Sequence, residues 1–186
     1  MAEVVDTRTL YTGWTEFSLV KLRLKDGAVV ERCVEDHGEA AVVLPYDAER
    51  RVAVLVRQVR AAVTYMGEEE FPEAPAGLID DDESPETAAM REAEEETGLK
   101  LRSLEPLGRF WSSPGASTET SWLYLAEFSP ADRTGAGGGV DDHEDIEVIE
   151  LPLAELAERA RRGELNDLKL AVLVLSLMNR RPDLFA

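Results

Sequence analysis

Three glutamates with helical spacing could bind a divalent cation. Glu92 and Glu96 stand four residues apart, and Glu95 stands three residues from Glu92. In a helix, residues three and four apart lie on one face, whereas Glu94 points to nearly the opposite side. Clustered carboxylates repel one another unless a cation lies among them, and oxygen ligands suit Mg²⁺ or Mn²⁺. The spacing therefore predicts a metal-binding face on one helix.

The residues around these carboxylates predict a short helix with defined ends. Ser84 is a good N-cap, and Pro85 follows at the first helical position, where its missing N–H costs no hydrogen bond. Gly98 is a typical C-terminal stop. The side opposite the carboxylates carries small residues that can pack closely against a sheet, namely Ala88, Ala89 and Ala93. We therefore expect a loop that leads into a sheet-packed helix.

The composition favours a globular protein and disfavours several functional classes. The net charge of −18 argues against binding to a nucleic-acid backbone. Cys33 is the only cysteine, so an internal disulfide is excluded and a reducing compartment is expected. The first ten residues carry no signal-peptide pattern, and the apolar run at 168–178 is too short to span a bilayer. These features predict a soluble cytoplasmic protein.

Apolar patterning predicts six strands, at 17–24, 28–34, 40–46, 52–60, 104–112 and 121–128. The Asp26-Gly27 pair predicts a hairpin between the first two strands. The third and fourth strands have longer apolar runs, which are typical of strands covered on both faces. Residues 61–76 hold no clear element.

The C-terminal third predicts one more strand and two helices. The strand is expected near 146–149, and the helices at 152–162 and 165–179. Residues 135–139, with the sequence GAGGG, are expected to form a mobile loop. The last helix is expected to pack through a stripe of Leu168, Ala171, Val172 and Leu175. Strands and helices mixed in this order predict a layered α/β domain.

The spacing around the acidic helix resembles the signature of the Nudix hydrolases, G-x5-E-x7-R-E-U-x-E-E-x-G-U, where U is apolar. Every fixed position is met, by Gly77, Glu83, Arg91, Glu92, Ala93, Glu95, Glu96, Gly98 and Leu99. The resemblance implies a Nudix α/β/α sandwich with a mixed sheet over residues 39–186. A small N-terminal antiparallel β region over residues 1–38 would precede it and is expected to form a homodimer.

The resemblance also implies a metal site. Mg²⁺, with Mn²⁺ as an alternative, would be held by Glu92, Glu96 and the backbone carbonyl of Ala76. Glu95 would complete the catalytic cluster. Arg91, four residues before Glu95, is expected to steady the acidic side chains rather than to touch substrate.

The resemblance also implies a further carboxylate, as metal ligand or catalytic base, on a loop after the signature stretch Gly77–Leu99, which we call the box. The matching residue is Glu144. The acidic stretch here is one residue longer than the usual pattern, so Asp142 or Asp145 are alternatives for this role.

Features outside the box resemble the branch that acts on nucleoside diphosphate sugars, and GDP-mannose pyrophosphatases in particular. Pro114 lies fifteen residues beyond the last box position, and the chain contains the stretches GAGGGV and GELNDLKLAVLVL. Arg57 and Arg60 lie three residues apart on a predicted strand, so only one is expected to face the site, and the resemblance favours Arg60. The substrate-binding residues implied by the resemblance are Arg32, Arg60, Glu73, Glu119 and Lys169.

These features lead to one expected activity and two alternatives. The expected activity is Mg²⁺-dependent hydrolysis of the pyrophosphate bond of a nucleotide sugar to a nucleoside monophosphate and a sugar phosphate. ADP-ribose is an alternative substrate. A Nudix-fold nucleotide sensor without catalysis is the other alternative, although an intact set of box carboxylates argues against it.

Overall fold

The computed structural model describes residues 1–140 and 145–185, and it divides into two compact units. The first unit combines Met1–Glu39 with Phe110–Ser121, and the second combines Ala40–Arg109 with Trp122–Ala186. The candidate carboxylates of the box all lie in the second unit. The N-terminal unit therefore contains a second segment, residues 110–121, which the sequence did not associate with the N-terminal strands.

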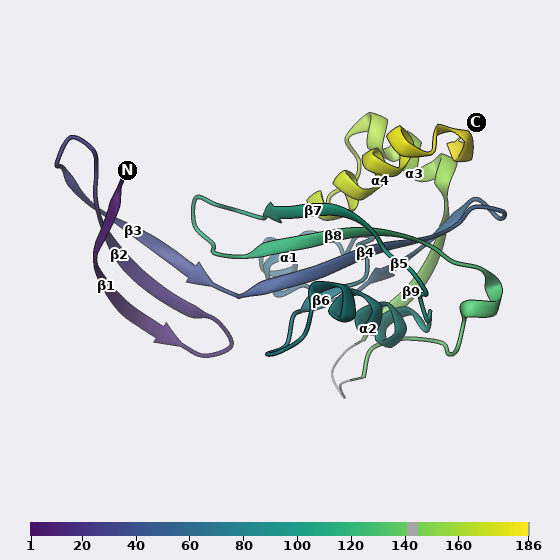
Figure 1. Cartoon of the computed structure of the whole chain (residues 1–186), viewed down its shortest axis with the longest axis horizontal. Coiled ribbons are helices and arrows are strands. Elements are labelled where there is room, and N and C mark those ends of the chain that lie inside the picture. The colour runs from purple at the N-terminus through teal and green to yellow at the C-terminus, as the bar shows by residue number, and fades with distance from the viewer. Residues whose placement is uncertain (141–144, 186) are drawn as a thin grey trace. The chain divides into compact units, whose positions relative to one another are not determined.

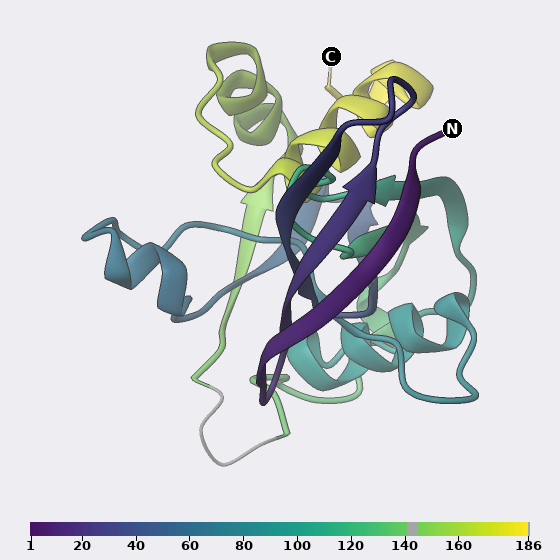
Figure 2. The same cartoon turned by 90° about the vertical axis from the view of Figure 1, so that its left-hand side faces the viewer.

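The first unit is built on a three-stranded antiparallel sheet with the order β1-β2-β3. Its strands are β1 (Glu3–Thr12), β2 (Glu16–Arg23) and β3 (Val29–Asp36). Figure 2 shows the three strands side by side. The β2–β3 hairpin was predicted, and Gly27 takes a φ of 87° in its turn, a conformation that favours glycine. Strand β1 was not expected from the sequence.

The larger sheet is mixed, with the strand order β7-β8-β4-β5-β9, and β6 pairs with β4 beside this path. It belongs to the second unit except for Glu39 and residues 110–111 and 120–121, at the ends of three strands. The strands are β4 (Glu39–Asp47), β5 (Val52–Arg57), β6 (Ala76–Leu78), β7 (Glu105–Trp111), β8 (Thr120–Glu127) and β9 (Glu147–Pro152). Strands β5 and β9 pair antiparallel, whereas β8 runs in the same direction as β4 (Figure 1).

Helices cover both faces of this sheet (Figure 1). The helices are α1 (Ala61–Tyr65), α2 (Pro85–Thr97), α3 (Leu153–Arg162) and α4 (Leu168–Arg180), with short 3₁₀ helices at Pro130–Asp132 and Pro182–Phe185. Helix α2 packs on one face, against Ala41 and Val43 of β4. Helices α3 and α4 pack on the other face, against Val42 and Leu44. Because alternate residues of β4 enter opposite cores, the predicted burial of this strand on both faces is confirmed.

Two details differ from the sequence-based expectations. Residues 61–76, which showed no clear element, contain helix α1 and the start of β6. Helix α4 also buries a different stripe from the one expected, namely Leu170, Leu173, Val174 and Leu177, while Leu168 and Leu175 are exposed. The Asp167 side chain caps the helix by accepting hydrogen bonds from the backbone N–H groups of Lys169 and Leu170, which fixes where the helix begins. Among the described residues, none of the helices is long and apolar enough to cross a membrane.

Candidate functional site

Helix α2 has the ends that the sequence predicts. The hydroxyl of Ser84 accepts a hydrogen bond from the backbone N–H of Thr87 at 3.1 Å, and Pro85 is the first helical residue. At the other end Gly98 takes a left-handed conformation with a φ of 70°, and its N–H donates to the carbonyl of Glu94. These two caps fix which residues of the acidic stretch are helical, and therefore which carboxylates share a face.

Arg91 lies at the centre of a network of ion pairs. Its guanidinium donates two hydrogen bonds to Glu83, at 3.1 and 2.9 Å, and one to the carbonyl of Leu78 at 3.1 Å. Its Nη1 also donates to Glu92 at 2.6 Å and to Glu95 at 3.1 Å. Hydrogen bonding to Arg91 holds the pKa of Glu83 below its ordinary value. As predicted, Arg91 contacts the acidic side chains, and through Glu83 and Leu78 it also joins the preceding loop to the helix.

Replacing Arg91 with lysine is expected to destabilise the protein by roughly 2 kcal/mol, because an ammonium group cannot form the bidentate contact to Glu83 and still reach the other carboxylates. Urea unfolding at pH 7 measures the change. The exposed pair of Arg162 and Glu158 on α3 provides the control, since Arg162→Lys should cost less than about 0.5 kcal/mol. Equal losses in the two variants would contradict the role of Arg91 in this network.

Glu92 lies directly over Gly77 of strand β6. A Cβ atom added to Gly77 would lie 2.0 Å from Glu92 Oε1 and 2.2 Å from its Cδ, which is far inside van der Waals contact. The absence of a side chain at Gly77 therefore leaves the space that the Glu92 carboxylate fills. A larger residue at position 77 would displace this carboxylate, which is the end of a flexible side chain, so the glycine sets where Glu92 lies.

Glu96 is the most deeply buried of the helix carboxylates, with 6% of its surface exposed. Its Oε2 accepts a hydrogen bond from the backbone N–H of Ala76 at 3.0 Å, and Gln58 Nε2 lies 3.5 Å from its Oε1. Burial raises the pKa of Glu96 to about 8, and the charge of Glu92 adds to this, while the Ala76 N–H and Arg60 act in the opposite direction. Without a bound metal ion, and with Arg60 already taken into account, a pKa of about 8 means that this carboxyl binds a proton near neutral pH.

The chemistry of the predicted ligand atoms, the carboxylate oxygens of Glu92, Glu95 and Glu96 and the carbonyl oxygen of Ala76, fits a divalent cation. All are oxygen atoms, and a buried carboxyl with a raised pKa is a group that a cation would return to its charged form. Among residues 1–140 and 145–185, however, no three His, Cys, Asp or Glu side chains are placed so that they could hold a metal ion together. Arg91 Nη1 instead bonds both Glu92 and Glu95. Ala76 and Glu96, two predicted ligand residues, are in direct contact.

Arg60 and Glu73 form a bidentate ion pair. Arg60 Nε lies 3.0 Å from Glu73 Oε1, and Nη2 lies 3.0 Å from Oε2. Backbone hydrogen bonds with Val56 hold Glu73 against the end of strand β5. Burial lowers the pKa of Arg60, but its contacts with Glu73, together with the charges of Glu96 and Asp167, raise it above the ordinary value. A fixed positive charge therefore lies within electrostatic reach of the buried Glu96.

Arg57 and Arg60 have different partners, but strand alternation is not the reason, because β5 ends at Arg57 and the predicted strand 52–60 is three residues too long. Arg57, the last residue of β5, pairs with Glu147 of β9 at 2.6 Å. Arg60 lies beyond the strand, at the N-terminal end of α1. Of these two arginines, only Arg60 is paired with a residue of the segment that leads into the box, Glu73.

Two residues near the site were missed by the sequence reasoning. Gln58 contacts the Glu96 carboxylate, and the buried Asp167 pairs with Lys169 Nζ at 3.0 Å while it caps α4. The signal for Asp167 was its N-cap position before an apolar run, which is recognisable in the sequence. No sequence signal distinguishes Gln58 from an ordinary polar residue at a strand end.

The remaining predicted residues lie in other parts of the chain. Arg32 and Glu119 belong to the first unit, where Arg32 donates to the carbonyl of Glu31 and Glu119 accepts a hydrogen bond from the Ser112 hydroxyl at 2.9 Å. Glu144 and Asp142 lie outside the described residues, whereas Asp145 is described and exposed. Like the roles of the other site residues, the assignments of Arg32, Glu119 and Glu144 stay predictions.

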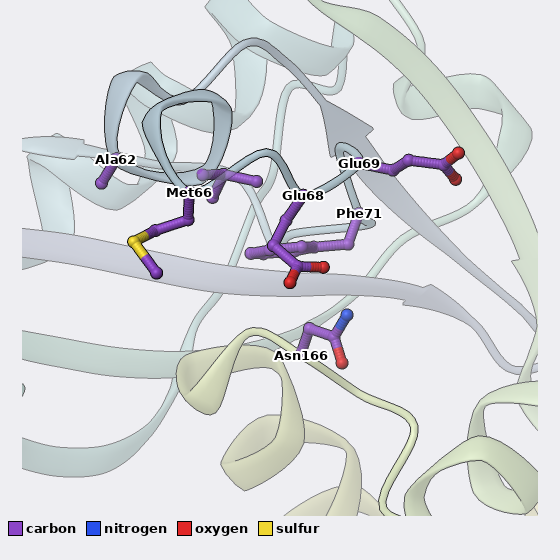
Figure 3. A pocket seen from close by; sticks show the side chains of 7 residues that line it. Ala62, Met66, Glu68, Glu69, Phe71 and Asn166 are labelled. Atoms are coloured by element: carbon purple, nitrogen blue, oxygen red, sulfur yellow. The ribbon is translucent and has the colours of Figure 1, made fainter.

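A cavity of about 520 Å³ lies between α1 and the turn before α4 (Figure 3). Met66 and Phe71 give it apolar surface, and the carboxylates of Glu68 and Glu69 and the amide of Asn166 lie at its edge. Its lining includes two acidic side chains and no basic one. Because carboxylates repel phosphate groups, this cavity does not suit a pyrophosphate.

The NUDIX domain profile matches residues 36–170 of the chain. A protein of Cronobacter sakazakii named GDP-mannose pyrophosphatase is 43% identical over 163 residues, which cover 86% of this chain and 84% of the relative. Proteins of the same name from Escherichia coli and Shigella boydii are 42% identical over 157 residues, 82% of this chain and 81% of theirs.

A solved structure described as "Crystal structure of ADP compounds hydrolase" has the same fold. Its TM-score is 0.78 at 18% sequence identity, and the match covers 98% of this chain and 95% of the other. The Gly77–Leu99 pattern, the helices on both faces of a mixed sheet and the profile match agree with one another. The chain therefore belongs to the NUDIX domain family.

Proposed function

We propose that this protein hydrolyses the pyrophosphate bond of a nucleoside diphosphate sugar, with GDP-mannose as the favoured substrate. The products are a nucleoside monophosphate and a sugar phosphate. The observation that carries the proposal is the buried Glu96 carboxylate, which is held against Ala76 on the helix face of Glu92 and lies within electrostatic reach of Arg60. The names of the relatives at 42–43% identity support the choice of substrate.

The metal ion is proposed to be Mg²⁺, with Mn²⁺ as a substitute, because carboxylate and carbonyl oxygens suit these ions. Glu92, Glu96 and the Ala76 carbonyl would hold it, with Glu95 close by and Glu144 as the ligand supplied by the later loop. When bound, such an ion neutralises charge on the phosphate oxygens and lowers the pKa of a bound water.

The residues of the chain are proposed to bind the substrate and move one proton. Arg60, oriented by Glu73, binds a phosphate oxygen, since a guanidinium matches the geometry of phosphate. A water oxygen attacks one phosphorus, the bond from that phosphorus to the bridging oxygen breaks, and the water proton passes to Glu144. Asp142 and Asp145 are the alternatives for this base. Lys169, Glu119 and Arg32 are proposed as further substrate contacts.

We also propose that the enzyme is a cytoplasmic homodimer that binds neither nucleic acid nor membranes. A single cysteine among 186 residues suits a reducing compartment, and a net charge of −18 opposes binding to a phosphate backbone. Exposed apolar residues on the N-terminal strands, among them Val4, Leu10 and Tyr11, support self-association through that region.

A coupled phosphatase assay with Mg²⁺ tests the proposed activity. A phosphatase removes phosphate from the monoester products but not from the intact pyrophosphate, so phosphate release reports cleavage. We expect GDP-mannose to be the best substrate in a panel that includes ADP-ribose and UDP-glucose. A higher kcat/KM for ADP-ribose would change the substrate assignment. Binding of nucleotide sugars without cleavage of any of them would favour the sensor alternative.

A further inference from the structure

Residues 133–139, which we call the strap, lie on the C-terminal turn of α2. The last carbonyls of a helix have no partner within the helix, so they need donors from elsewhere. Here the strap supplies four donors to backbone carbonyl oxygens. Gly139 N–H donates to the carbonyl of Glu95 at 3.2 Å, and Gly138 N–H donates to the carbonyl of Glu96 at 2.9 Å. Arg133 Nη1 donates to the carbonyl of Thr97 at 3.0 Å, and Thr134 N–H donates to the carbonyl of Gly98 at 2.8 Å. The sequence predicted a mobile loop at 135–139, whereas the structure shows a hydrogen-bonded segment.

The strap lies against the backbone of the helix at Gly137. A Cβ atom there would lie 2.4 Å from the carbonyl oxygen of Glu96 and 2.6 Å from the carbonyl carbon and Cα of Thr97. These are backbone atoms of a capped helix and cannot turn aside as a flexible side chain could. Gly137 also has a φ of 73°, a conformation that L side chains rarely adopt. Glycine is therefore required at this position on two separate grounds.

We propose that Gly137 is a positioning residue for the Glu96 carboxylate. By allowing the strap to lie directly on the Glu96–Thr97 peptide, it sets the position of the last turn of α2 and hence the distance from Glu96 to Ala76. The inference rests on the metal-binding role proposed for Glu96. Gly137 would contact neither substrate nor metal and would act only through the backbone.

Titration of the substrate-free protein with Mn²⁺, followed by electron paramagnetic resonance of the free ion, tests this role directly. Gly137→Ala is expected to weaken Mn²⁺ binding about 10-fold or more, as the loss of other outer contacts to metal ligands does. With GDP-mannose, we expect kcat at saturating Mg²⁺ to fall by a similar factor while KM changes less than about 2-fold, because the substrate-binding residues are untouched.

Two matched alanine variants separate positioning from general strain. Gly163 has a φ of 70°, close to that of Gly137, but an added Cβ would meet nothing within 4 Å. Gly135 lies in the strap itself, also with open space around an added Cβ and without a positive φ. Gly163→Ala and Gly135→Ala are expected to bind Mn²⁺ within about 2-fold of the wild-type affinity. A loss in Gly163→Ala equal to that in Gly137→Ala would reduce the effect to strain and overturn the proposal.

A second pair of variants keeps the test valid if Gly137→Ala does not fold. Arg133→Met removes the donor to Thr97 and one contact to Glu150, whereas Arg50→Met removes the other guanidinium contact to Glu150 and a longer one to Asp47 at 4.0 Å but leaves the donor to Thr97 in place. We expect several-fold weaker Mn²⁺ binding in the first variant alone. Wild-type affinity in folded Gly137→Ala and in Arg133→Met would overturn the strap's role while the proposed function stands. Failure of the wild-type protein to bind Mn²⁺ would overturn both.

Discussion

Replacing Glu96 with glutamine is expected to lower kcat by about 10²-fold or more while the fold stays intact. Glutamine keeps the size of the side chain and can still accept the hydrogen bond from Ala76 N–H, but it carries no charge for a cation. The measurement is turnover of GDP-mannose at saturating Mg²⁺, with circular dichroism to verify the fold.

Glu94→Gln is the matched control for this variant. Glu94 belongs to the same helix, but its side chain is exposed and points away from the carboxylate face. It accepts a hydrogen bond from the Thr134 hydroxyl at 3.2 Å, and the amide oxygen of glutamine can accept the same bond. Its turnover should stay within about 2-fold of wild type, as is usual for an exposed substitution. Unchanged turnover in Glu96→Gln would remove Glu96 from the metal site, and equal losses in both variants would point to the net charge of the helix.

The metal-free protein is expected to lose stability as the pH rises toward and through about 8. Burial raises the pKa of Glu96 from 4.5 to about 8 in the folded protein, so the folded state binds this proton more tightly than the unfolded state. The resulting stabilisation is complete below the unfolded pKa near 4.5, falls as the pH rises, and is lost above the folded pKa. The expected change in the free energy of unfolding is on the order of a few kcal/mol.

Urea unfolding in EDTA at pH 6 and pH 9 measures this change. Glu96→Gln cannot ionise, so its stability should fall less over the same interval, and the difference between the two proteins isolates the contribution of Glu96. Added Mg²⁺ at pH 9 should stabilise the wild-type protein more than the variant. Parallel pH profiles for both proteins would show that burial does not hold a proton on Glu96.

The part of the site that the sequence predicts well is the part with local signals. Ser84, Pro85 and Gly98 define the ends of α2 within one short stretch, so the shared face of Glu92, Glu95 and Glu96 follows from helix geometry alone. Contacts across the chain had no such signal. Gln58 reaches Glu96 only because β5 carries it there, and Ala76 N–H meets the same carboxylate only once β6 pairs with β4.

Two sequence-based predictions were wrong for similar physical reasons, the buried stripe of α4 and the mobile loop at residues 135–139. Helix α4 is apolar over most of its surface, so several stripes satisfy helical periodicity, and packing against α3 and the sheet selects the one containing Leu170 and Leu177. The glycine-rich composition of residues 135–139 indicated flexibility, because composition does not reveal a position such as Gly137 where positive φ and close approach both require glycine. Partners far away in sequence decide both cases.

The two cores of the second unit differ in what holds their helices. Helix α4 buries three leucines and a valine, whereas α2 buries mainly Ala88, Ala89 and Ala93 and is held by its caps, Arg91 and the strap. Alanine buries little apolar area, so the attachment of α2 depends on polar contacts. Salt screens ion pairs and leaves apolar contacts intact, so the attachment of α2, and with it the position of the carboxylates, depends on ionic strength more than the attachment of α4 does.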